Sequence, residues 1–281
     1  MLVIGKATFI YTPCSGLHGR SMKYNTLMVK KEGNVFTVTL NRPEVHNALN
    51  EKLMRELTGC FREINLDETI RVVVLTGNGK SFCAGADLNW MKNMAKYSKE
   101  ENVQDSKLLL DLYETIDTCS KPVIGKINGH AFGGGLGLLA VCDVTIALPD
   151  LKFAFSEVKL GIIPAVISSY IIRRIGLANT RRLFITGERF DSSYAERIGL
   201  VDYVVSRETF DAAVEKHVEL VKSSGPLAVK EVKNLFQQYQ KMDINDYKNF
   251  TVEKIAELRV SKEGQEGIHA FLEKRKPLWR E

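Results

Sequence analysis

Three successive glycines, Gly133 to Gly135, place the strongest constraint on how this chain can fold. They follow the β-forming segment Val123 to Ile127 and precede the apolar run Leu136 to Ala140, which predicts a tight turn from a strand into a buried helix. The first N–H groups of a helix lack partners inside it, and glycine lets a ligand oxygen approach them without meeting a Cβ atom. The turn therefore predicts an anion or oxyanion site, although glycine clusters also serve purely structural turns.

A second loop of similar character lies earlier in the chain. Residues 81–88, Ser-Phe-Cys-Ala-Gly-Ala-Asp-Leu, follow the strand-like run at 71–76. Two such loops can supply two converging N–H donors, which stabilise negative charge on a carbonyl oxygen as it becomes an enolate or a tetrahedral oxyanion. Catalysis would also need a nucleophile or a base.

The composition is that of a soluble globular protein. With 281 residues, 44% hydrophobic and 26% charged, the chain has room for one large domain, or for one with a smaller appendage. No apolar run approaches the ~20 residues of a membrane span. The five cysteines are widely spaced and form no CxxC pair, so neither a disulfide framework nor a zinc site is indicated. We expect a reducing compartment and a cytoplasmic location.

The net charge of +5 is spread along the chain, and its densest patch lies at the C-terminus, from Lys274 to Arg280. Such a patch can hold the phosphates of a nucleotide-like ligand, bind nucleic acid, or serve only as a solvated tail. Nucleic-acid binding is the weaker of these interpretations, because no aromatic and basic residues alternate as a stacking platform.

Strand and helix patterns alternate over residues 34–160, which predicts repeated ββα or βαβ units around a buried sheet. Asn50 has the position of a helix N-cap, and Ser98 with Glu101 has the pattern of a capping box. We expect strands at residues 34–40, 72–76, 123–127, 144–147 and 152–155.

From about residue 167 onward, helix patterns dominate. This part is short and amphipathic, so we expect it to pack on its own core or on a neighbouring subunit. The expected helices are 167–176, 179–186, 207–224, 226–241 and 245–260, with a strand-like stretch at 200–205.

Glu157 is the best candidate for a catalytic base. The chain has no GxSxG serine elbow and no HExxH motif, and no histidine lies in a recognisable triad setting, which leaves acid–base work by a carboxylate. Glu157 follows the apolar segment 153–155, and apolar neighbours would raise its pKa toward general-base behaviour. The alternative is a structural glutamate paired with Lys159 or Arg173.

Four motifs together make the chain resemble the crotonase (enoyl-CoA hydratase/isomerase) superfamily from about Tyr24 to Trp279. They are Leu-Asn-Arg-Pro at 40–43 with His-Asn-Ala-Leu at 46–49, the loop at 81–88, Asn-Gly-His-Ala-Phe-Gly-Gly-Gly at 128–135 with Cys-Asp at 142–143, and Phe-Ser-Glu-Val-Lys-Leu-Gly-Ile-Ile-Pro at 155–164.

The resemblance implies an α/β fold: a crotonase-like spiral of ββα units with a C-terminal helical trimerisation region. It also implies a homotrimer, commonly assembled as a hexameric dimer of trimers. On this basis we expect the spiral core at 23–205 and a helical oligomerisation region at 206–281. Residues 1–22 contain no acidic residue, and a targeting peptide, a misassigned start and an ordered extension are the alternatives there. Because the segment is too weakly apolar for a secretory signal and too poor in arginine for a transit peptide, we expect a disordered extension.

The substrate implied by the resemblance is an acyl-CoA thioester, with coenzyme A part of the substrate, no separate cofactor and no metal. The N–H groups of Ala84 and Gly134 would hold its carbonyl oxygen, and Glu157 would be the acid–base carboxylate. The residues expected to bind the substrate and its CoA moiety are Cys83, Ala84, Ala86, Asp87, Leu88, Gly134 and Lys274.

Gly137 departs from the family pattern, because hydratases commonly carry a second glutamate there. A single carboxylate is typical of Δ3,Δ2-enoyl-CoA isomerases, which move one proton. The run at 156–167, however, in which residues 164–168 replace the usual glycine-rich turn, is most similar to hydratases of methylglutaconyl-CoA and related branched substrates. If the protein is a hydratase, another group must hold the water. The candidates are His130, Ser156, Ser168 and Asp111.

The resulting prediction is a hydratase or dehydratase of short or branched enoyl-CoA thioesters, with an isomerase as the alternative. Fatty acid metabolism and branched-chain amino acid degradation are the settings that fit such substrates. A non-catalytic acyl-CoA-binding subunit stays open as a different class, although the retained Glu157 counts against it.

Overall fold

The computed structural model describes residues 24–280, and the extension expected at residues 1–22 lies outside them. Two β-sheets form the centre of the molecule. The first has the strand order β1-β2-β3-β5-β7-β10, and the second has the order β4-β6-β8-β9. The strands are β1 Leu27–Glu32, β2 Val35–Leu40, β3 Val72–Gly77, β4 Ser81–Cys83, β5 Val123–Ile127, β6 His130–Phe132, β7 Val144–Ala147, β8 Lys152–Ala154, β9 Phe190–Asp191 and β10 Tyr203–Val204.

The chain repeats one pattern three times. In each repeat, one strand joins the first sheet, the next strand joins the second sheet, and a helical segment follows. Strands β3 and β4 lead to α2 (Leu88–Met94) and α3 (Lys99–Asp117), β5 and β6 lead to α4 (Gly134–Ala140), and β7 and β8 lead through the 3₁₀ turn η2 (Glu157–Leu160) to α5 (Ser168–Thr186). Strands from successive repeats pair in parallel within each sheet. The repeating unit is therefore ββα, one of the two patterns that the sequence predicts.

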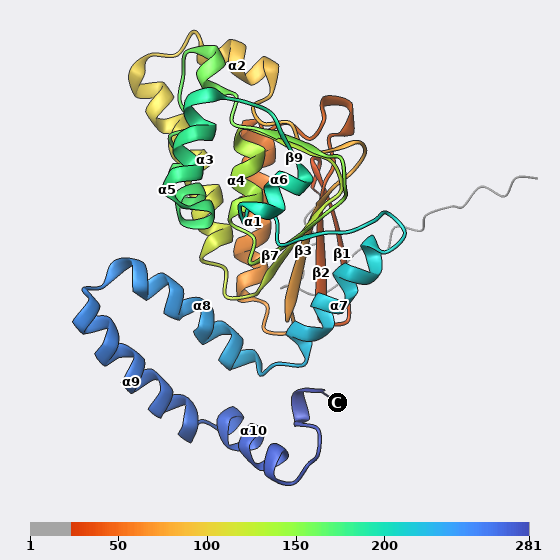
Figure 1. Cartoon of the computed structure of the whole chain (residues 1–281), viewed down its shortest axis with the longest axis vertical. Coiled ribbons are helices and arrows are strands. Elements are labelled where there is room, and N and C mark those ends of the chain that lie inside the picture. Colours follow the sequence, from red (N-terminus) through yellow and green to blue (C-terminus); the bar gives the residue numbers. More distant parts are fainter. Residues whose placement is uncertain (1–23, 281) are drawn as a thin grey trace, which may run out of the picture.

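Helix α1 (Glu51–Leu66) covers the first sheet and packs against α3 (Figure 1). Its N-cap is Asn50, whose side chain accepts a hydrogen bond from the Leu53 amide at 2.9 Å, and the capping box of Ser98 and Glu101 opens α3. Both predicted caps are thus confirmed. Apolar residues at helical spacing line the buried face of α1: Leu53, Leu57, Phe61 and Ile64.

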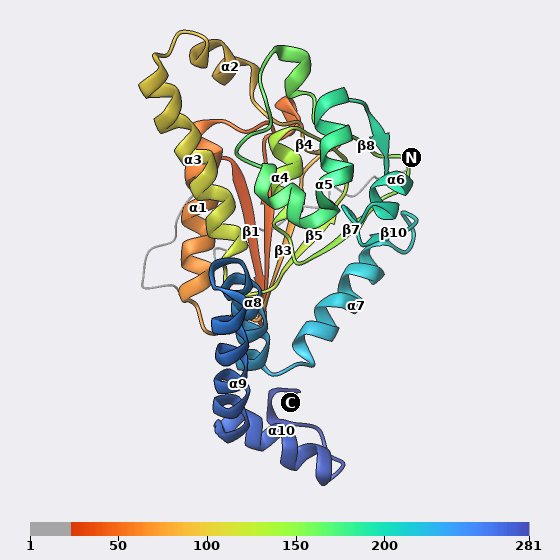
Figure 2. The ribbon, with the colours of Figure 1, turned by 60° about the vertical axis from the view of Figure 1, so that its left-hand side comes forward.

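The C-terminal part is helical. Helices α8 (Pro226–Lys241), α9 (Ile244–Val260) and α10 (Lys262–Leu272) extend away from the body that holds the sheets, as Figures 1 and 2 show. They leave large apolar side chains in solvent, among them Phe236 at 64% and Phe271 at 83% exposure. Among the helices within residues 24–280, none is both long and apolar enough to cross a membrane. The helices of this part are α6 Ser192–Arg197, α7 Phe210–Lys222, α8 Pro226–Lys241, α9 Ile244–Val260 and α10 Lys262–Leu272, and the short 3₁₀ turns are η1 Pro43–Val45 and η3 Leu278–Arg280.

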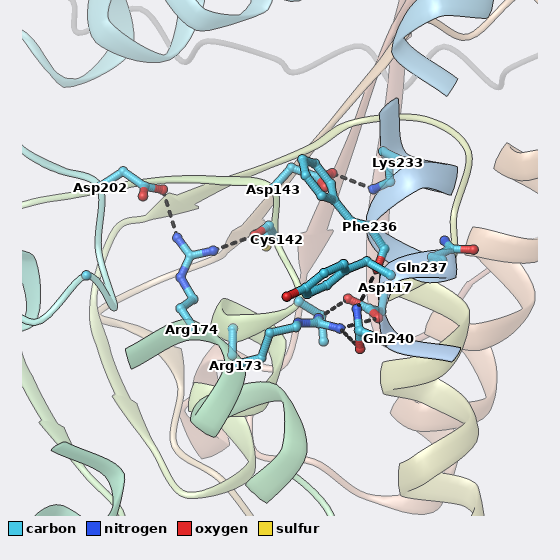
Figure 3. A pocket seen from close by; sticks show the side chains of 14 residues that line it. Asp117, Cys142, Asp143, Arg173, Arg174, Asp202, Lys233, Phe236, Gln237 and Gln240 are labelled. Atoms are coloured by element: carbon cyan, nitrogen blue, oxygen red, sulfur yellow. Dashed lines mark hydrogen bonds and ion pairs between the residues drawn. The ribbon is translucent and has the colours of Figure 1, made fainter. Parts of the chain in front are cut away.

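A hollow between α8 and the body, shown in Figure 3, contains the contact that anchors α8. The Lys233 ammonium, on a side chain only 8% exposed, lies 2.5 Å from Oδ2 of Asp143. The same carboxylate oxygen accepts a hydrogen bond from the Val123 amide at 2.7 Å. Arg174 lines the same hollow and pairs with Asp202 at 2.8 Å. The Lys233–Asp143 contact ties the first projecting helix to the starts of β5 and β7.

Several elements differ from the sequence expectations: β4, β6, β9, α2 and α6 are not among the predicted elements, and three further differences have a clear cause. Strand β1 was not predicted from the sequence. It is an edge strand that contains the charged residues Lys30 to Glu32, so the alternation of apolar and polar residues along it is weak. The strand expected at 200–205 is only Tyr203–Val204, because Leu200 and Val201 are buried in the turn that follows α6. The helices expected at 167–176 and 179–186 form one element, α5, interrupted at Gly176, where φ is 73°.

Candidate active site

The candidate residues converge because they follow three neighbouring strands of the second sheet. Strand β6 pairs in parallel with β4 on one side and with β8 on the other. The carboxyl ends of parallel strands meet at one edge of a sheet. The loop at 84–88, the glycine turn at 133–135 and Glu157 therefore emerge at the same edge.

The glycine turn lies directly against the first loop. The backbone of Gly133 has φ +48°, a left-handed conformation that favours glycine, and its amide donates a hydrogen bond to the Ala154 oxygen at 3.0 Å. A Cβ atom on Gly135 would stand 2.3 Å from the carbonyl oxygen of Cys83. Only glycine permits this close approach of the two backbones.

The structure corrects one of the two expected oxyanion donors. The Ala84 amide already donates to the carbonyl oxygen of His46 at 3.0 Å, so it is not available to a ligand. The amides of Ala86 and Gly134 have no hydrogen-bond acceptor within residues 24–280, and both residues are partly exposed. A bridge between Leu49 and Ala86 holds the first loop in place. The available pair of backbone donors is therefore Ala86 and Gly134.

Glu157 lies beside the glycine turn, next to Gly133. It begins η2, and its Oε1 is 3.0 Å from the position that a Cβ on Gly133 would take. Its Oε2 is buried and has no hydrogen-bond partner among the described residues. Burial raises the pKa of Glu157 above its ordinary value of 4.5. Arg173, one of the two partners considered for Glu157, pairs with Asp117 instead.

Asp87, expected to bind the substrate, holds the protein's own loop. Its carboxylate caps α2 by accepting from the Asn89 and Trp90 amides, and Oδ2 lies 2.7 Å from an Arg42 guanidinium nitrogen. Burial alone would raise the pKa of Asp87, but the hydrogen bonds from Arg42 and the two amides lower it below the ordinary value. Asp87 is therefore ionised at neutral pH and fixes the entry of the chain into α2.

The other expected contact residues differ in their access to a ligand. Cys83 is fully buried, and burial raises the pKa of its thiol to about 12, so it is an apolar packing residue here. Leu88 is 75% exposed at the start of α2. Lys274 follows α10, which lies at the opposite end of the molecule from α2 (Figure 1), so the structure does not bring Lys274 to this site within one chain.

Tyr113 is a site residue that the sequence reasoning missed. Its hydroxyl donates a hydrogen bond to the Gly134 carbonyl oxygen at 2.7 Å, and a Cβ atom on Gly137 would stand only 2.7 Å from its ring atoms Cε1 and Cζ. The tyrosine lies next to Leu112 on the buried stripe of α3. A hydroxyl within such an apolar stripe needs a hydrogen-bond partner, and this was the available signal.

Three of the four candidate water-holders are engaged elsewhere. Nδ1 of His130 accepts from the Lys152 amide at 2.9 Å, Ser168 donates to the Ala165 oxygen at 2.7 Å, and Asp111 pairs with Arg62 at 2.7 Å. Ser156 precedes η2 and makes no side-chain cap hydrogen bond there. Between residues 24 and 280, no group of three or more histidine, cysteine or acidic side chains is placed to hold a metal ion.

The hollow of Figure 3 is separate from this site, because none of the predicted catalytic or substrate-binding residues lines it. A second hollow borders the site. It is lined by Arg42 and Asp87, by residues of the start of α1, and by Trp90 and Tyr97 around α2.

Comparisons with known proteins agree with this geometry. The family model described as enoyl-CoA hydratase/isomerase matches residues 30–281. The chain belongs to the enoyl-CoA hydratase/isomerase family. The resemblance seen in the sequence is thus confirmed, and so are the α/β fold and its crotonase-like spiral of ββα units.

Individual members of the enoyl-CoA hydratase/isomerase family match nearly end to end. A short-chain-enoyl-CoA hydratase of Clostridium acetobutylicum is 34% identical over 257 residues, covering 91% of this chain and 97% of that protein. The crystal structure of an enoyl-CoA hydratase from Shewanella pealeana has a TM-score of 0.87 at 38% identity, covering 92% and 97% of the two chains. AtuE of Pseudomonas aeruginosa has a TM-score of 0.89 at 32% identity, covering 92% and 100%.

Proposed function

We propose that the protein adds water to the double bond of a short or branched enoyl-CoA thioester, or removes it in the reverse direction. The observation that carries the proposal is the buried Oε2 of Glu157, which has no partner among the described residues and lies 3.8 Å from the Cβ position of Gly133, the residue before the free amide of Gly134. A polar atom is buried without a partner at a cost, so such an atom at a glycine turn is typical of a functional group that meets its partner in the substrate.

The amides of Ala86 and Gly134 hold the thioester carbonyl oxygen. When the oxygen of water adds to C3, negative charge develops on the carbonyl oxygen, and two fixed donors stabilise the enolate by roughly 10²–10³ in rate for each donor. Glu157 takes the proton released by the water and delivers a proton to C2, which returns the carboxylate to its starting state. One carboxylate with a raised pKa suits both halves of this transfer.

The hollow beside the site suits the phosphates of coenzyme A. Its lining holds Lys52 together with Arg42 and Arg55, which pair with Asp87 and Glu51 of the same lining, and Trp90 and Tyr97 contribute aromatic surface. Cations and aromatic rings together are the chemistry that binds a nucleotide. The thioester end would then reach the amides of Ala86 and Gly134 past the loop at 84–88.

We further propose that the substrate brings the only coenzyme, that no separate cofactor takes part, and that the protein acts in the cytoplasm. The division into a core at 23–205 and an oligomerisation region at 206–281 remains part of the proposal, with a homotrimer or a dimer of trimers as the assembly. The exposed apolar side chains of α8 and α10 support it. Lys274 would bind CoA only across such an interface, since α10 lies away from its own site.

The second candidate function is isomerisation of a 3-enoyl-CoA to a 2-enoyl-CoA. The absence of a carboxylate at Gly137 favours it, because moving a double bond needs only one base to carry a proton between C4 and C2. A non-catalytic acyl-CoA-binding role is less favoured, since Glu157 is present and its buried Oε2 has no partner among the described residues.

Mass spectrometry of a substrate panel tests the proposal. The protein is incubated in deuterated water with crotonyl-CoA, a 3-enoyl-CoA and 3-methylglutaconyl-CoA, and we expect a 2-enoyl substrate to gain one water with deuterium at C2. A 3-enoyl substrate that changes its retention time to that of the 2-enoyl isomer, without added water, would identify an isomerase. Binding of these thioesters with no change in any of them would identify the non-catalytic class.

A further inference from the structure

The space beside Gly137 is filled by a tyrosine ring. A Cβ atom at residue 137 would stand 2.5 Å from Cγ2 of Ile167 and 2.7 Å from two ring atoms of Tyr113. Contacts that short do not occur between real Cβ atoms and their neighbours. Residue 137 therefore cannot carry a carboxylate side chain while Tyr113 keeps its present position. The tyrosine ring takes the volume that a second acid would need.

The hydroxyl of Tyr113 is directed at the oxyanion turn. It donates to the carbonyl oxygen of Gly134 at 2.7 Å, and it would lie 3.0 Å from a Cβ atom on the same residue. The tyrosine is wholly buried, so water does not compete for this hydrogen bond. The bond therefore fixes residue 134, whose amide is one of the two free donors of the site.

Glu157 and Tyr113 border consecutive residues of one turn. Oε1 of Glu157 lies 3.0 Å from the Cβ position of Gly133, and the Tyr113 hydroxyl lies 3.0 Å from that of Gly134. Burial raises the pKa of Tyr113 well above 10, and the nearby Cys83 and Glu157 add to the shift. The phenol therefore stays protonated and keeps donating throughout the range in which Glu157 exchanges its proton.

We propose that Tyr113 is a positioning residue for the hydration reaction, whose ring replaces a second acid beside Gly137 and whose hydroxyl holds the Gly134 amide on the developing enolate oxygen. This inference rests on the proposed function. Because the hydroxyl acts on a donor that matters most in the transition state, its removal lowers kcat more than it weakens binding of the thioester.

The test compares two variants that each remove one hydroxyl from a buried tyrosine. Tyr113→Phe keeps the ring, so the packing against Gly137 is retained. Tyr170→Phe is the matched control, because Tyr170 is 7% exposed and its ring centroid lies 5.9 Å from that of Tyr113. We expect Tyr113→Phe to lower kcat about tenfold with KM changed less than twofold, the scale of one hydrogen bond. Tyr170→Phe should change neither.

A binding measurement gives an answer that does not depend on turnover. Acetoacetyl-CoA forms an enolate that absorbs in the near ultraviolet, whereas butyryl-CoA develops no such charge. We expect Tyr113→Phe to weaken binding of the acetoacetyl-CoA enolate about tenfold, and to weaken binding of butyryl-CoA less than twofold. Equal weakening of both probes, or an unchanged kcat, would overturn the inference. If the wild-type protein hydrates nothing, the proposed function fails, and the two probes still test the role of the hydroxyl at the donor.

Discussion

At the scale of single residues, the site combines one buried acid with two backbone donors. Glu157 could be predicted from the sequence, because a carboxylate that directly follows an apolar strand is costly to bury unless it serves a reaction or meets a partner. The donor in the first loop could not, since Ala84 and Ala86 are equivalent in sequence. Only the hydrogen bond from Ala84 to the His46 oxygen distinguishes them, and that bond depends on how a distant loop folds. Tyr113 was missed although its hydroxyl in the apolar stripe of α3 signals a buried partner, because the sequence does not say which backbone oxygen that partner is.

The raised pKa of Glu157 predicts two opposite responses to pH. Hydration that needs the carboxylate should fall as pH decreases, with a midpoint above 4.5 in the kcat/KM profile. Stability moves the other way. The folded state binds the Glu157 proton more tightly than the unfolded state, so this group costs stability as pH rises through the window between 4.5 and the raised pKa.

Glu157→Gln removes this titration. The unfolding free energy of the variant relative to wild type should therefore rise as pH increases from 4.5 through the raised pKa of Glu157, as urea denaturation at each pH can show. A difference that stays constant over this range would mean that the Glu157 pKa is not raised.

Gly137 should not tolerate even a methyl group. Gly137→Ala places a Cβ atom 2.5 Å from Ile167 and should destabilise the protein by about 1–3 kcal/mol through overpacking. Gly59→Ala is the matched control, because Gly59 lies inside α1 with no atom within 4 Å of its Cβ position. That change should stabilise the protein by about 0.5–1 kcal/mol. Urea denaturation measures both, and equal effects would show that residue 137 is not crowded.

At the scale of elements, periodicity and caps predicted most of the structure. Helix α1 begins at the predicted cap Asn50, and α8 has the predicted bounds, 226–241. Periodicity failed where tertiary contacts decide the outcome. The short strand β10 forms only where Tyr203 and Val204 meet β7, and α5 is interrupted by the backbone of Gly176 rather than by a change in its apolar pattern.

The attachment of α8 should depend on one buried cation. Lys233→Met leaves Asp143 without its ammonium partner and should lower stability by about 1–3 kcal/mol. It should also speed amide hydrogen exchange in α8 selectively. Lys230→Met, on the exposed face of the same helix, is the control and should change neither. Unaltered exchange in α8 after Lys233→Met would show that the ion pair does not anchor the helix.

At the scale of the whole molecule, contacts within one chain do not explain why the projecting helices α8 to α10 expose apolar side chains. Their apolar side chains face solvent, with Phe271 83% exposed in α10. The amphipathic pattern predicted a region that packs on itself or on a neighbour, but the pattern alone cannot choose between the two. The extended course of α8 to α10 favours a neighbour (Figures 1 and 2).

We expect sedimentation velocity to give a mass three or six times the 31.6 kDa of one chain. Phe271→Asp should shift the protein toward smaller species, because it places a charge in the proposed apolar interface. Leu220→Asp, at 54% exposure on α7, is the control and should leave the mass unchanged. A monomeric wild-type protein at micromolar concentration would contradict the proposed assembly.

The central claim is that Glu157 alone moves the proton at C2 of a thioester held by the Ala86 and Gly134 amides. The most direct test incubates wild-type protein and Glu157→Gln with crotonyl-CoA in deuterated water. Mass spectrometry then measures the deuterium content at C2 of the product. We predict one added water with deuterium at C2 for the wild type, and a rate lower by about 10²–10⁴ for the variant. Deuterium incorporation by Glu157→Gln at the wild-type rate would contradict the claim.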